Sequence, residues 1–151
     1  MLYLSAMDNI ITIEFTVMGE PKGKGRPRFS KVGRVYTPRA TAEYEATVRQ
    51  AAWVAMAQAK ETPTEKDVYV ELLANHGVPA SWPKKKQALA YAGAMRPKRP
   101  DLDNVVKAVL DGANNVIYRD DAQVHSIRAM KRYAPEGIHP SLLVRMSWSK
   151  D

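Results

Sequence analysis

The chain has 151 residues with a net charge of +7, 45% hydrophobic and 26% charged residues and no cysteine, which is the composition of one ordinary globular domain. The absence of cysteine excludes disulfides, thiolate metal sites and cysteine nucleophiles, and no apolar run approaches the ~20 residues that cross a bilayer. Because the N-terminus lacks the basic segment of a signal peptide, we expect a cytoplasmic protein with a single domain over residues 1–151, in which residues 1–9 are a candidate flexible extension.

The first predicted element is a strand over residues 10–18, where apolar and polar side chains alternate as they do in a strand with one buried face. Residues 19–39 are instead rich in glycine, proline and basic residues, and glycine and proline interrupt both helices and strands. We therefore expect a long loop, with a short hairpin around Gly33 as the only regular structure within it.

Two helices and a second strand are predicted next. Apolar residues recur every three or four positions from residue 40 to about residue 60, which predicts a helix, and residues 67–76 have the pattern of a strand. Ser81 is a suitable N-cap for a basic helix over residues 82–92.

The last third of the chain is predicted to hold one helix and two strands. A basic linker over residues 95–100 precedes a helix over residues 103–114, whose end is indicated by Gly112 and by Asn114-Asn115. Residues 122–133 and 141–148 are expected to form closing strands. The side chains of the helix that we expect in the core are Val105, Val106, Val109, Leu110 and Ala113.

Basic residues are concentrated in two segments. Residues 19–39 hold seven Lys or Arg and one acidic residue, and residues 84–99 hold six and none, so the remainder of the chain is net acidic. A basic patch beside an acidic remainder favours a nucleic-acid partner over the alternative of a solvated surface or a disordered arm. Phe29 or Tyr36 could stack on bases or enter a branch point. The candidate phosphate contacts are Lys22, Lys24, Arg26, Arg28, Arg34, Lys84, Lys85, Lys86, Arg96, Lys98 and Arg99.

Aspartates are concentrated around the third helix. Asp101 and Asp103 flank its start, where free backbone N–H groups and the helix dipole favour aspartate, although capping explains one of them better than two. Asp103, Lys107 and Asp111 are four residues apart and share one helix face, a spacing that ordinary surface ion pairs would also explain.

Two further aspartates, Asp120 and Asp121, follow in a predicted turn, where aspartate is common for local reasons. If the turn folds back on the helix start, carboxylates from two elements converge, and because like charges repel, such a cluster needs a cation. Oxygen ligands favour Mg²⁺ or Mn²⁺, which activates water and stabilises the leaving oxygen at a phosphodiester. Lys107 would then neutralise the charge that develops in the transition state.

The segment RPDLDNVVKAVLDGANNVIYRDDAQV resembles the signature of the RusA family of Holliday-junction resolvases. That signature has an Asp-Leu-Asp-Asn run, a Lys six positions after the first Asp, a helix, and an Asp-Asp-Ala/Ser-Gln turn that leads into a strand. The segments GEPKGKGRPRF, VYTP and SWPKKK are similar to those of phage and prophage members. The resemblance covers the chain from about residue 10 to residue 148.

This resemblance implies a small α/β (α+β) domain, with a mixed sheet flanked by helices, that forms an intertwined homodimer. It implies a crossover junction endodeoxyribonuclease that uses Mg²⁺, or Mn²⁺ in its place, and resolves four-way junctions by paired symmetric nicks in recombination and repair. By the resemblance, Asp101, Asp103 and Asp121 are metal ligands, Asp120 is a further candidate, and Lys107 is the catalytic lysine. Asp111 has a supporting role.

Two alternatives stay open. The loop over residues 19–39 is not shared by all family members, so a broader nuclease for branched or flap DNA is one of them. The other is a basic nucleic-acid-binding module without catalysis, against which the clustered aspartates argue. The histidines His76, His125 and His139 lack zinc-ligand spacing and receive no role. The tryptophans Trp53, Trp82 and Trp148 are expected in the core or in an interface.

Overall fold

Four strands form one mixed sheet in the computed structural model, which describes residues 9–151. The order across the sheet is β1-β6-β4-β5; β6 pairs antiparallel with both β1 and β4, and β4 pairs parallel with β5. The predicted extension covers residues 1–9, and residues 1–8 of it lie outside the described residues. The strands are β1 (Ile10–Met18), β4 (Val68–His76), β5 (Val124–Tyr133) and β6 (Ser141–Ser149).

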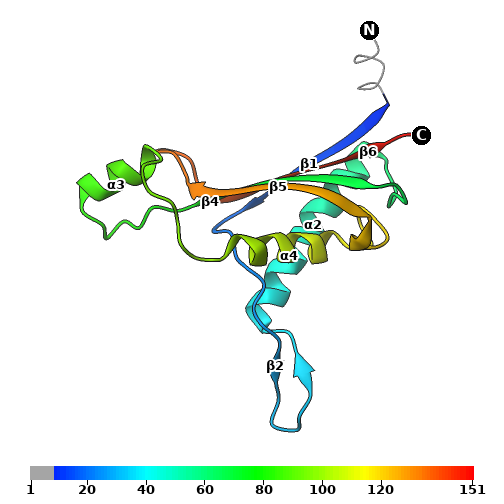
Figure 1. Cartoon of the computed structure of the whole chain (residues 1–151), viewed down its shortest axis with the longest axis horizontal. Helices are drawn as coiled ribbons and strands as arrows, with labels where there is room; N and C mark the ends of the chain where they lie inside the picture. Colours follow the sequence, from blue (N-terminus) through cyan, green and yellow to red (C-terminus); the bar gives the residue numbers. More distant parts are fainter. Residues whose placement is uncertain (1–8) are drawn as a thin grey trace.

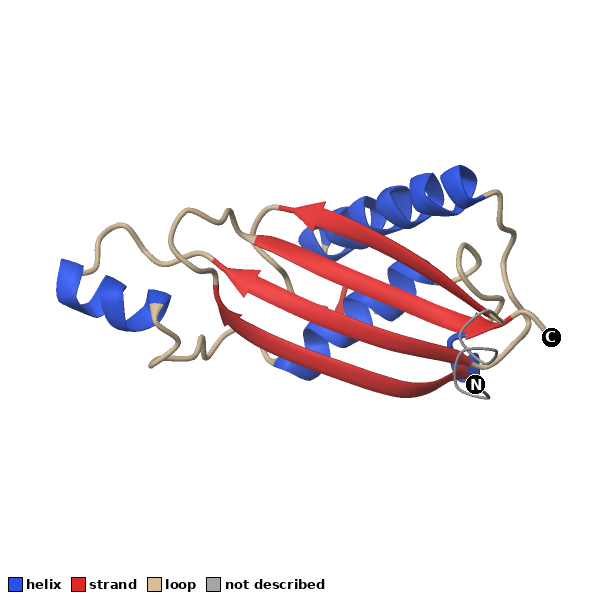
Figure 2. Cartoon of the chain, turned by 90° about the horizontal axis from the view of Figure 1, so that it is seen from above, coloured by secondary structure: helices blue, strands red, loops and turns tan. Residues whose placement is uncertain are grey.

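Two helices, α2 (Arg39–Ala59) and α4 (Leu102–Ala113), cover one face of the sheet (Figure 1). The short helix α3 (Lys84–Tyr91) lies beyond one end of the strands, and Figure 2 shows the sheet from its open side with the helices behind it. This arrangement confirms the expected α/β (α+β) domain with a mixed sheet flanked by helices. No helix among residues 9–151 is long and apolar enough to cross a membrane.

The core lies between the sheet and the two long helices. The strand alternation predicted from the sequence is present, since Ile13, Phe15 and Val17 are buried toward the helices while their neighbours are exposed. β6 contributes alternate residues to the same core because it is an inner strand with one covered face. The buried side chains of β6 are Leu142, Val144, Met146 and Trp148.

The sequence analysis expected Gly112 to help end the helix, but Gly112 lies buried inside α4 against α2. A Cβ atom at this position would lie 2.7 Å from Val48 Cγ1, so glycine allows the two helix backbones to approach closely. The helix ends after Ala113, where Asn114 adopts an extended conformation, so the second predicted stop signal, Asn114-Asn115, is confirmed. The predicted core of α4 is correct at Val105, Val109 and Ala113, whereas Val106 and Leu110 are only partly buried.

The structure also tests the predictions for Ser81 and for the tryptophans. The basic helix begins after Pro83 and has no side-chain cap, so Ser81 is not its N-cap. Trp148 is buried in the core, one of the two places expected for the tryptophans. Trp53 lies on the outer side of α2 with 58% of its surface exposed, which excludes the core and leaves the interface as the prediction for this residue.

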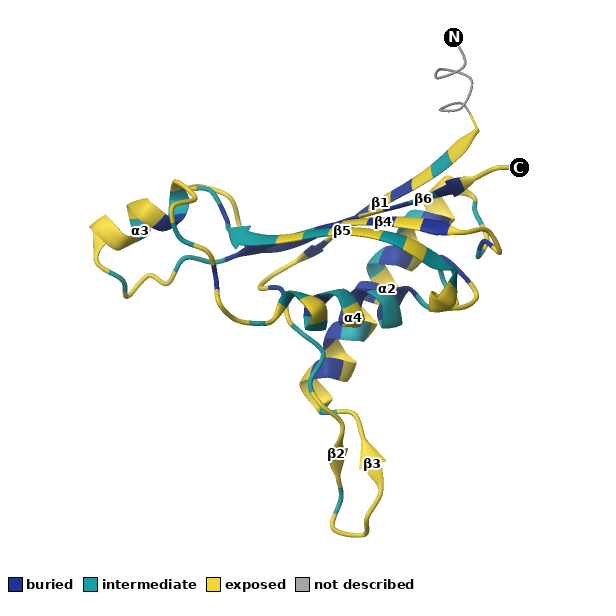
Figure 3. Ribbon diagram, viewed as in Figure 1, coloured by how far each residue is buried: buried dark blue, intermediate teal, exposed yellow. Residues whose placement is uncertain are grey.

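The segment between β1 and α2 contains the short hairpin that the sequence analysis expected at Gly33. Its strands are β2 (Arg28–Phe29) and β3 (Val35–Tyr36), which pair antiparallel. Figure 3 shows this hairpin projecting from the helical layer with almost all of its residues exposed.

Candidate active site

Asp101 and Asp103 lie at the start of α4, as predicted. Asp101 is the N-cap residue, and its carbonyl oxygen accepts hydrogen bonds from the backbone N–H groups of Asn104 and Val105. Its carboxylate makes no capping hydrogen bond, and both aspartates are exposed. Because no capping hydrogen bond occupies these carboxylates, both are accessible to a cation, although Asp103 in the first turn also interacts favourably with the helix dipole.

The ion pairs expected along the helix face at Asp103, Lys107 and Asp111 do not form among the described residues. Lys107 is exposed one turn after Asp103, while Asp111 pairs with Lys24 from the basic loop. Ordinary surface pairing therefore does not explain the spacing of Asp103 and Lys107.

The basic loop passes directly beside the start of α4. The Lys24 backbone N–H donates to the Asn104 carbonyl at 2.8 Å, and a Cβ atom at Gly23 would lie 3.0 Å from the Asn104 and Pro100 Cβ atoms. Glycine at position 23 thus lets the backbone lie against α4. This contact places the backbone of Gly23 and Lys24 beside Asn104, at the start of α4.

The Lys24 side chain lies along α4 rather than in solvent. Its ammonium pairs with the Asp111 carboxylate and lies 3.4 Å from a Glu45 carboxylate oxygen of α2. The hydrogen bond to Asp111, with the nearby charges, raises the pKa of Lys24 above its usual value. Its charge is therefore already neutralised within the protein, and the contact ties the loop to both helices. The sequence carried no local signal for this pair, because its partners are far apart in the chain.

The linker before α4 is held in a similar way. The Lys131 ammonium of β5 donates to the carbonyl oxygens of Lys98 at 2.8 Å and Pro100 at 3.1 Å. Arg96, Lys98 and Arg99 are exposed on this fixed linker, immediately before Asp101. Lys131 is a residue that sequence reasoning missed.

α3 carries the other predicted basic residues at the same end of the sheet (Figure 1). The Lys86 ammonium lies 3.9 Å from the centroid of the Trp82 ring, which packs edge-to-face on Tyr133 of β5. Lys84 and Lys85 are exposed. The linker and α3 therefore lie toward the Asp101 end of α4, although α3 itself projects beyond the end of the sheet (Figure 1).

Asp120 and Asp121 lie at the other end of α4, in the turn that leads into β5. The Tyr118 hydroxyl donates to the Leu110 carbonyl at 2.6 Å, so this turn folds onto the end of the helix. Burial raises the pKa of the Tyr118 hydroxyl, which therefore stays protonated as a donor. The sequence analysis had considered a turn that folds back onto the start of the helix. Within one chain the turn instead folds onto the end of the helix, so that arrangement is wrong.

A capping box shapes this turn. Asp120 Oδ1 accepts from the Ala122 N–H at 2.8 Å, and Gln123 Oε1 accepts from the Arg119 and Asp120 N–H groups, each at 3.0 Å. The Gln123 amide also donates to the Thr64 and Lys66 carbonyls at 2.8 and 2.9 Å. Asp120 therefore has a structural task. The Asp-x-x-Gln spacing was readable in the sequence as such a box.

Asp121 is left exposed beside other carboxylates. Partial desolvation, a hydrogen bond with Asp120 and the charges of Asp120 and Asp111 raise the pKa of Asp121 above the usual aspartate value. A bound cation would relieve this repulsion. The sequence analysis gave Asp111 a supporting role, and Asp111 is the aspartate of α4 whose charge acts on Asp121.

The two acidic groups do not meet within one chain. Asp103 and Asp111 alone are separated by about 12 Å of helix at 1.5 Å per residue. Residues 9–151 contain no group of three or more His, Asp or Glu side chains gathered closely enough to hold a metal ion. Mg²⁺ is nevertheless often held by only one or two protein carboxylates, with water and substrate phosphate as its other ligands. The exposed pair Asp101 and Asp103 is a donor set of that kind.

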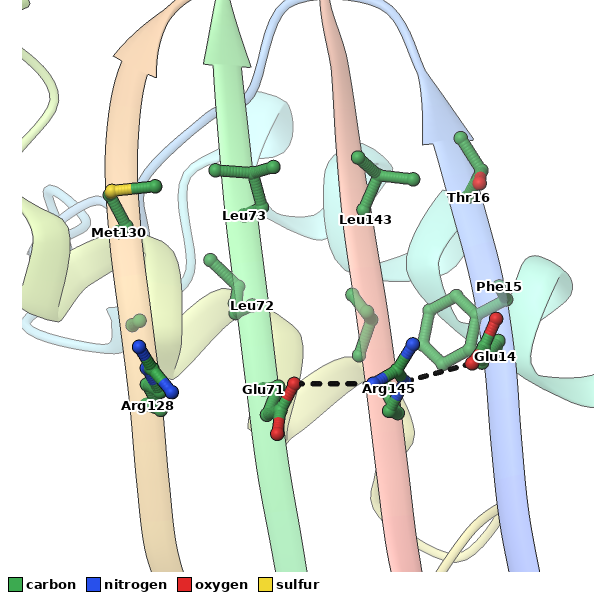
Figure 4. A pocket seen from close by; sticks show the side chains of 12 residues that line it. Glu14, Phe15, Thr16, Glu71, Leu72, Leu73, Arg128, Met130, Leu143 and Arg145 are labelled. Carbon is green, nitrogen blue, oxygen red and sulfur yellow. Dashed lines mark hydrogen bonds and ion pairs between the residues drawn. The ribbon is translucent and has the colours of Figure 1, made fainter.

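A broad hollow lies elsewhere, on the open face of the sheet (Figure 4). There the guanidinium of Arg145 pairs with Glu14 at 2.8 Å and with Glu71 at 3.6 Å. These charges satisfy one another across the strands, and the sheet separates them from α4. We assign this hollow no catalytic role.

A pair of exposed carboxylates that follows a basic linker is the arrangement expected of a protein that acts on a nucleic-acid backbone. Comparison with known proteins agrees with this class. The family model described as "Endodeoxyribonuclease RusA" matches residues 18–145. The chain is also 38% identical over 128 residues to a Bacillus subtilis (strain 168) protein, "Uncharacterized protein YqaN", covering 82% of this chain and 89% of that protein. The chain belongs to the RusA family, a family of endodeoxyribonucleases.

Proposed function

We propose that this protein is a divalent-metal-dependent endodeoxyribonuclease that nicks four-way DNA junctions during recombination and repair. The observation that carries the proposal is the family match over residues 18–145, which includes every residue of the candidate site. The accessible carboxylates of Asp101 and Asp103, directly after the exposed basic linker, support it.

Asp101 and Asp103 are the proposed metal ligands, and Lys107 lies one helical turn further along α4. Mg²⁺ bound there would supply an activated water and stabilise the leaving oxygen. The Lys107 ammonium would offset the negative charge that develops on the phosphate in the transition state. Lys22, Arg26 and the linker arginines contact phosphates and orient the strand. Lys24 is assigned a tethering task instead, because its charge is already paired.

Asp121 enters the proposal through a second copy of the chain. Two α4 helices that lie antiparallel about a two-fold axis would bring Asp121 of the partner subunit to Asp101 and Asp103. A two-fold axis makes both contacts equivalent and therefore creates two identical sites. Two sites related in this way suit paired nicks in two like strands of a junction.

The proposal is tested with a labelled four-way junction, a flap and a linear duplex, each incubated with the full chain with and without Mg²⁺. We expect Mg²⁺-dependent nicks in the junction, and we expect the Asp103→Asn variant to bind the junction at least as tightly as wild type without nicking it. Cleavage of flaps as well would favour the broader branched-DNA nuclease. Normal cleavage by Asp103→Asn would remove the proposed ligands, and binding without cleavage in Mg²⁺ and Mn²⁺ would leave only a binding protein.

A further inference from the structure

The β2–β3 hairpin projects on the side of the sheet that holds the helices (Figure 1). Several of its apolar side chains are exposed. Phe29 is 75% exposed, Val32 80% and Val35 61%. Exposed apolar side chains gathered on one small element mark a surface that binds a partner. The fold itself does not cover this surface, because the hairpin projects away from the helical layer (Figure 3).

The hairpin has a defined shape before any partner binds. The Ser30 N–H donates to the Arg34 carbonyl at 2.7 Å, the Gly33 N–H donates to the Ser30 carbonyl at 2.9 Å, and the Ser30 hydroxyl accepts from the Arg34 N–H at 3.1 Å. Gly33 adopts a φ of +79°, which glycine allows without strain. A preformed tip loses little conformational freedom when it inserts into a ligand.

The strand register divides the hairpin into two faces. Phe29 lies opposite Val35, so these apolar side chains share one face, with Val32 at the tip. Arg28 lies opposite Tyr36 on the other face. The tip is therefore a narrow apolar edge with a cation directly behind it.

The charges around the tip indicate what kind of partner it fits. Between Pro21 and Ala42 the sequence contains no acidic residue, and Arg28, Lys31 and Arg34 make no ion pair among the described residues. A ligand that matches this surface has an anionic exterior and flat apolar groups inside. Nucleic acid with an opened base step has both, whereas a closed duplex covers its bases.

The hairpin is close to the candidate metal ligands because the loop that leads into it is fixed to α4. Lys24 is hydrogen-bonded to Asn104, and the five residues from there to Phe29 span at most about 17 Å of extended chain. One strand of a duplex advances about 3.4 Å per nucleotide. The tip therefore reaches base steps within about five nucleotides of a phosphate at Asp103.

We propose that Phe29, with Val32 and Val35, enters the branch point of the DNA and holds its bases unstacked, while Arg28, Lys31 and Arg34 bind the flanking phosphates. This inference rests on the proposed function, since it assumes branched DNA at the Asp103 end of α4. It assigns the selectivity for junctions to the side chains of the hairpin tip, which are separate from the proposed metal ligands.

The test uses the full chain and a four-way junction with 2-aminopurine beside the branch point, in Ca²⁺ so that binding is measured without turnover. Wild-type protein should increase the 2-aminopurine fluorescence at saturation. The double variant Phe29→Ala/Val32→Ala should lose at least two thirds of this increase, and its preference for junction over linear duplex should fall about tenfold, as expected for one lost base–aromatic stack.

Two matched variants serve as controls. Trp53→Ala removes an aromatic side chain of similar exposure from α2 and should change nothing. Arg28→Ala/Arg34→Ala should weaken binding and reduce its salt dependence but keep the full fluorescence increase at saturation.

An unchanged fluorescence increase in Phe29→Ala/Val32→Ala overturns the inference. So does a loss of dimer mass in sedimentation of that variant, because the tip would then be packing on a second copy. If wild-type protein nicks the junction in Mg²⁺ but leaves 2-aminopurine quenched, the inference alone fails. If wild-type protein neither binds nor nicks the junction, the proposed function fails and the inference fails with it.

Discussion

Replacement of Gly112 by alanine tests the helix contact that positions both acidic ends of α4. The new Cβ would lie 2.7 Å from Val48 Cγ1, 2.8 Å from Val48 Cβ and 3.0 Å from the Glu45 carbonyl oxygen. Val48 is fully buried and a backbone carbonyl cannot rotate away, so the helices must separate. Overpacking of this kind costs about 1–3 kcal/mol, and we take the upper end because two of the three atoms belong to one fixed residue and the third to the backbone.

Part of this cost is offset, because alanine is a better helix former than glycine by about 1 kcal/mol. The expected net loss is about 2 kcal/mol in the free energy of unfolding, which lowers Tm by about 4–8 °C for a domain of this size. Thermal unfolding followed by circular dichroism measures the change.

A double-mutant cycle with Val48→Ala separates this contact from other effects of the substitution. Val48→Ala alone should destabilise by about 2 kcal/mol through lost burial and a cavity. In Gly112→Ala/Val48→Ala the methyl group of the new residue 112 occupies part of that cavity. The free energy of unfolding of the double variant should therefore be about 1–2 kcal/mol higher than the sum of the two single losses predicts. A higher Tm for Gly112→Ala, or strictly additive losses, would refute the packing argument.

Three further predictions concern charge and assembly. Lys24→Met should lower the free energy of unfolding by at most about 1 kcal/mol. Because the folded-state pKa of Lys24 is raised, the stability difference between wild type and variant should be complete below the usual lysine pKa of 10.5 and should disappear as pH rises through the raised value. Urea unfolding at pH 8 and 11 measures this difference. Lys22→Ala/Arg26→Ala should reduce the slope of log K against log salt for junction binding by about 0.9 per lost phosphate contact, while Lys24→Ala should leave the slope unchanged; an equal effect of all three residues would contradict the tethering task of Lys24. Asp103→Asn and Asp121→Asn should each abolish cleavage. A mixture of the two inactive proteins should regain a fraction of wild-type activity, because one of the two shared sites in a mixed dimer is intact. A mixture that stays inactive although the subunits exchange would argue against a site shared between two subunits.

Local patterns were sufficient to predict the individual elements. The alternation at Ile13, Phe15 and Val17 and the helical spacing at Tyr44, Val48 and Ala52 predicted the elements that form, because burial on one face imposes those periods on the sequence. The sheet order was not predictable in this way. β6 lies between β1 and β4, and such long-range pairing leaves no local signal.

The candidate site was predictable as a set of residues but not as an arrangement. Asp101 and Asp103 occupy the helix start that their types suggested. The place of Asp121 depended on one contact, the Tyr118 hydroxyl on the Leu110 carbonyl, which directs the turn to the end of α4. The end of α4 was predicted correctly from Asn114-Asn115, whereas Gly112 was misread, because a glycine that ends a helix and one that admits a neighbouring helix look alike in sequence.

The central claim is tested most directly by mapping nicks in a four-way junction whose strands are end-labelled one at a time, with wild-type protein in Mg²⁺. The account predicts nicks at symmetric positions in two opposite strands, within about five nucleotides of the branch point. Nicks spread along the arms, or equal cleavage of a linear duplex of the same sequence, would contradict it.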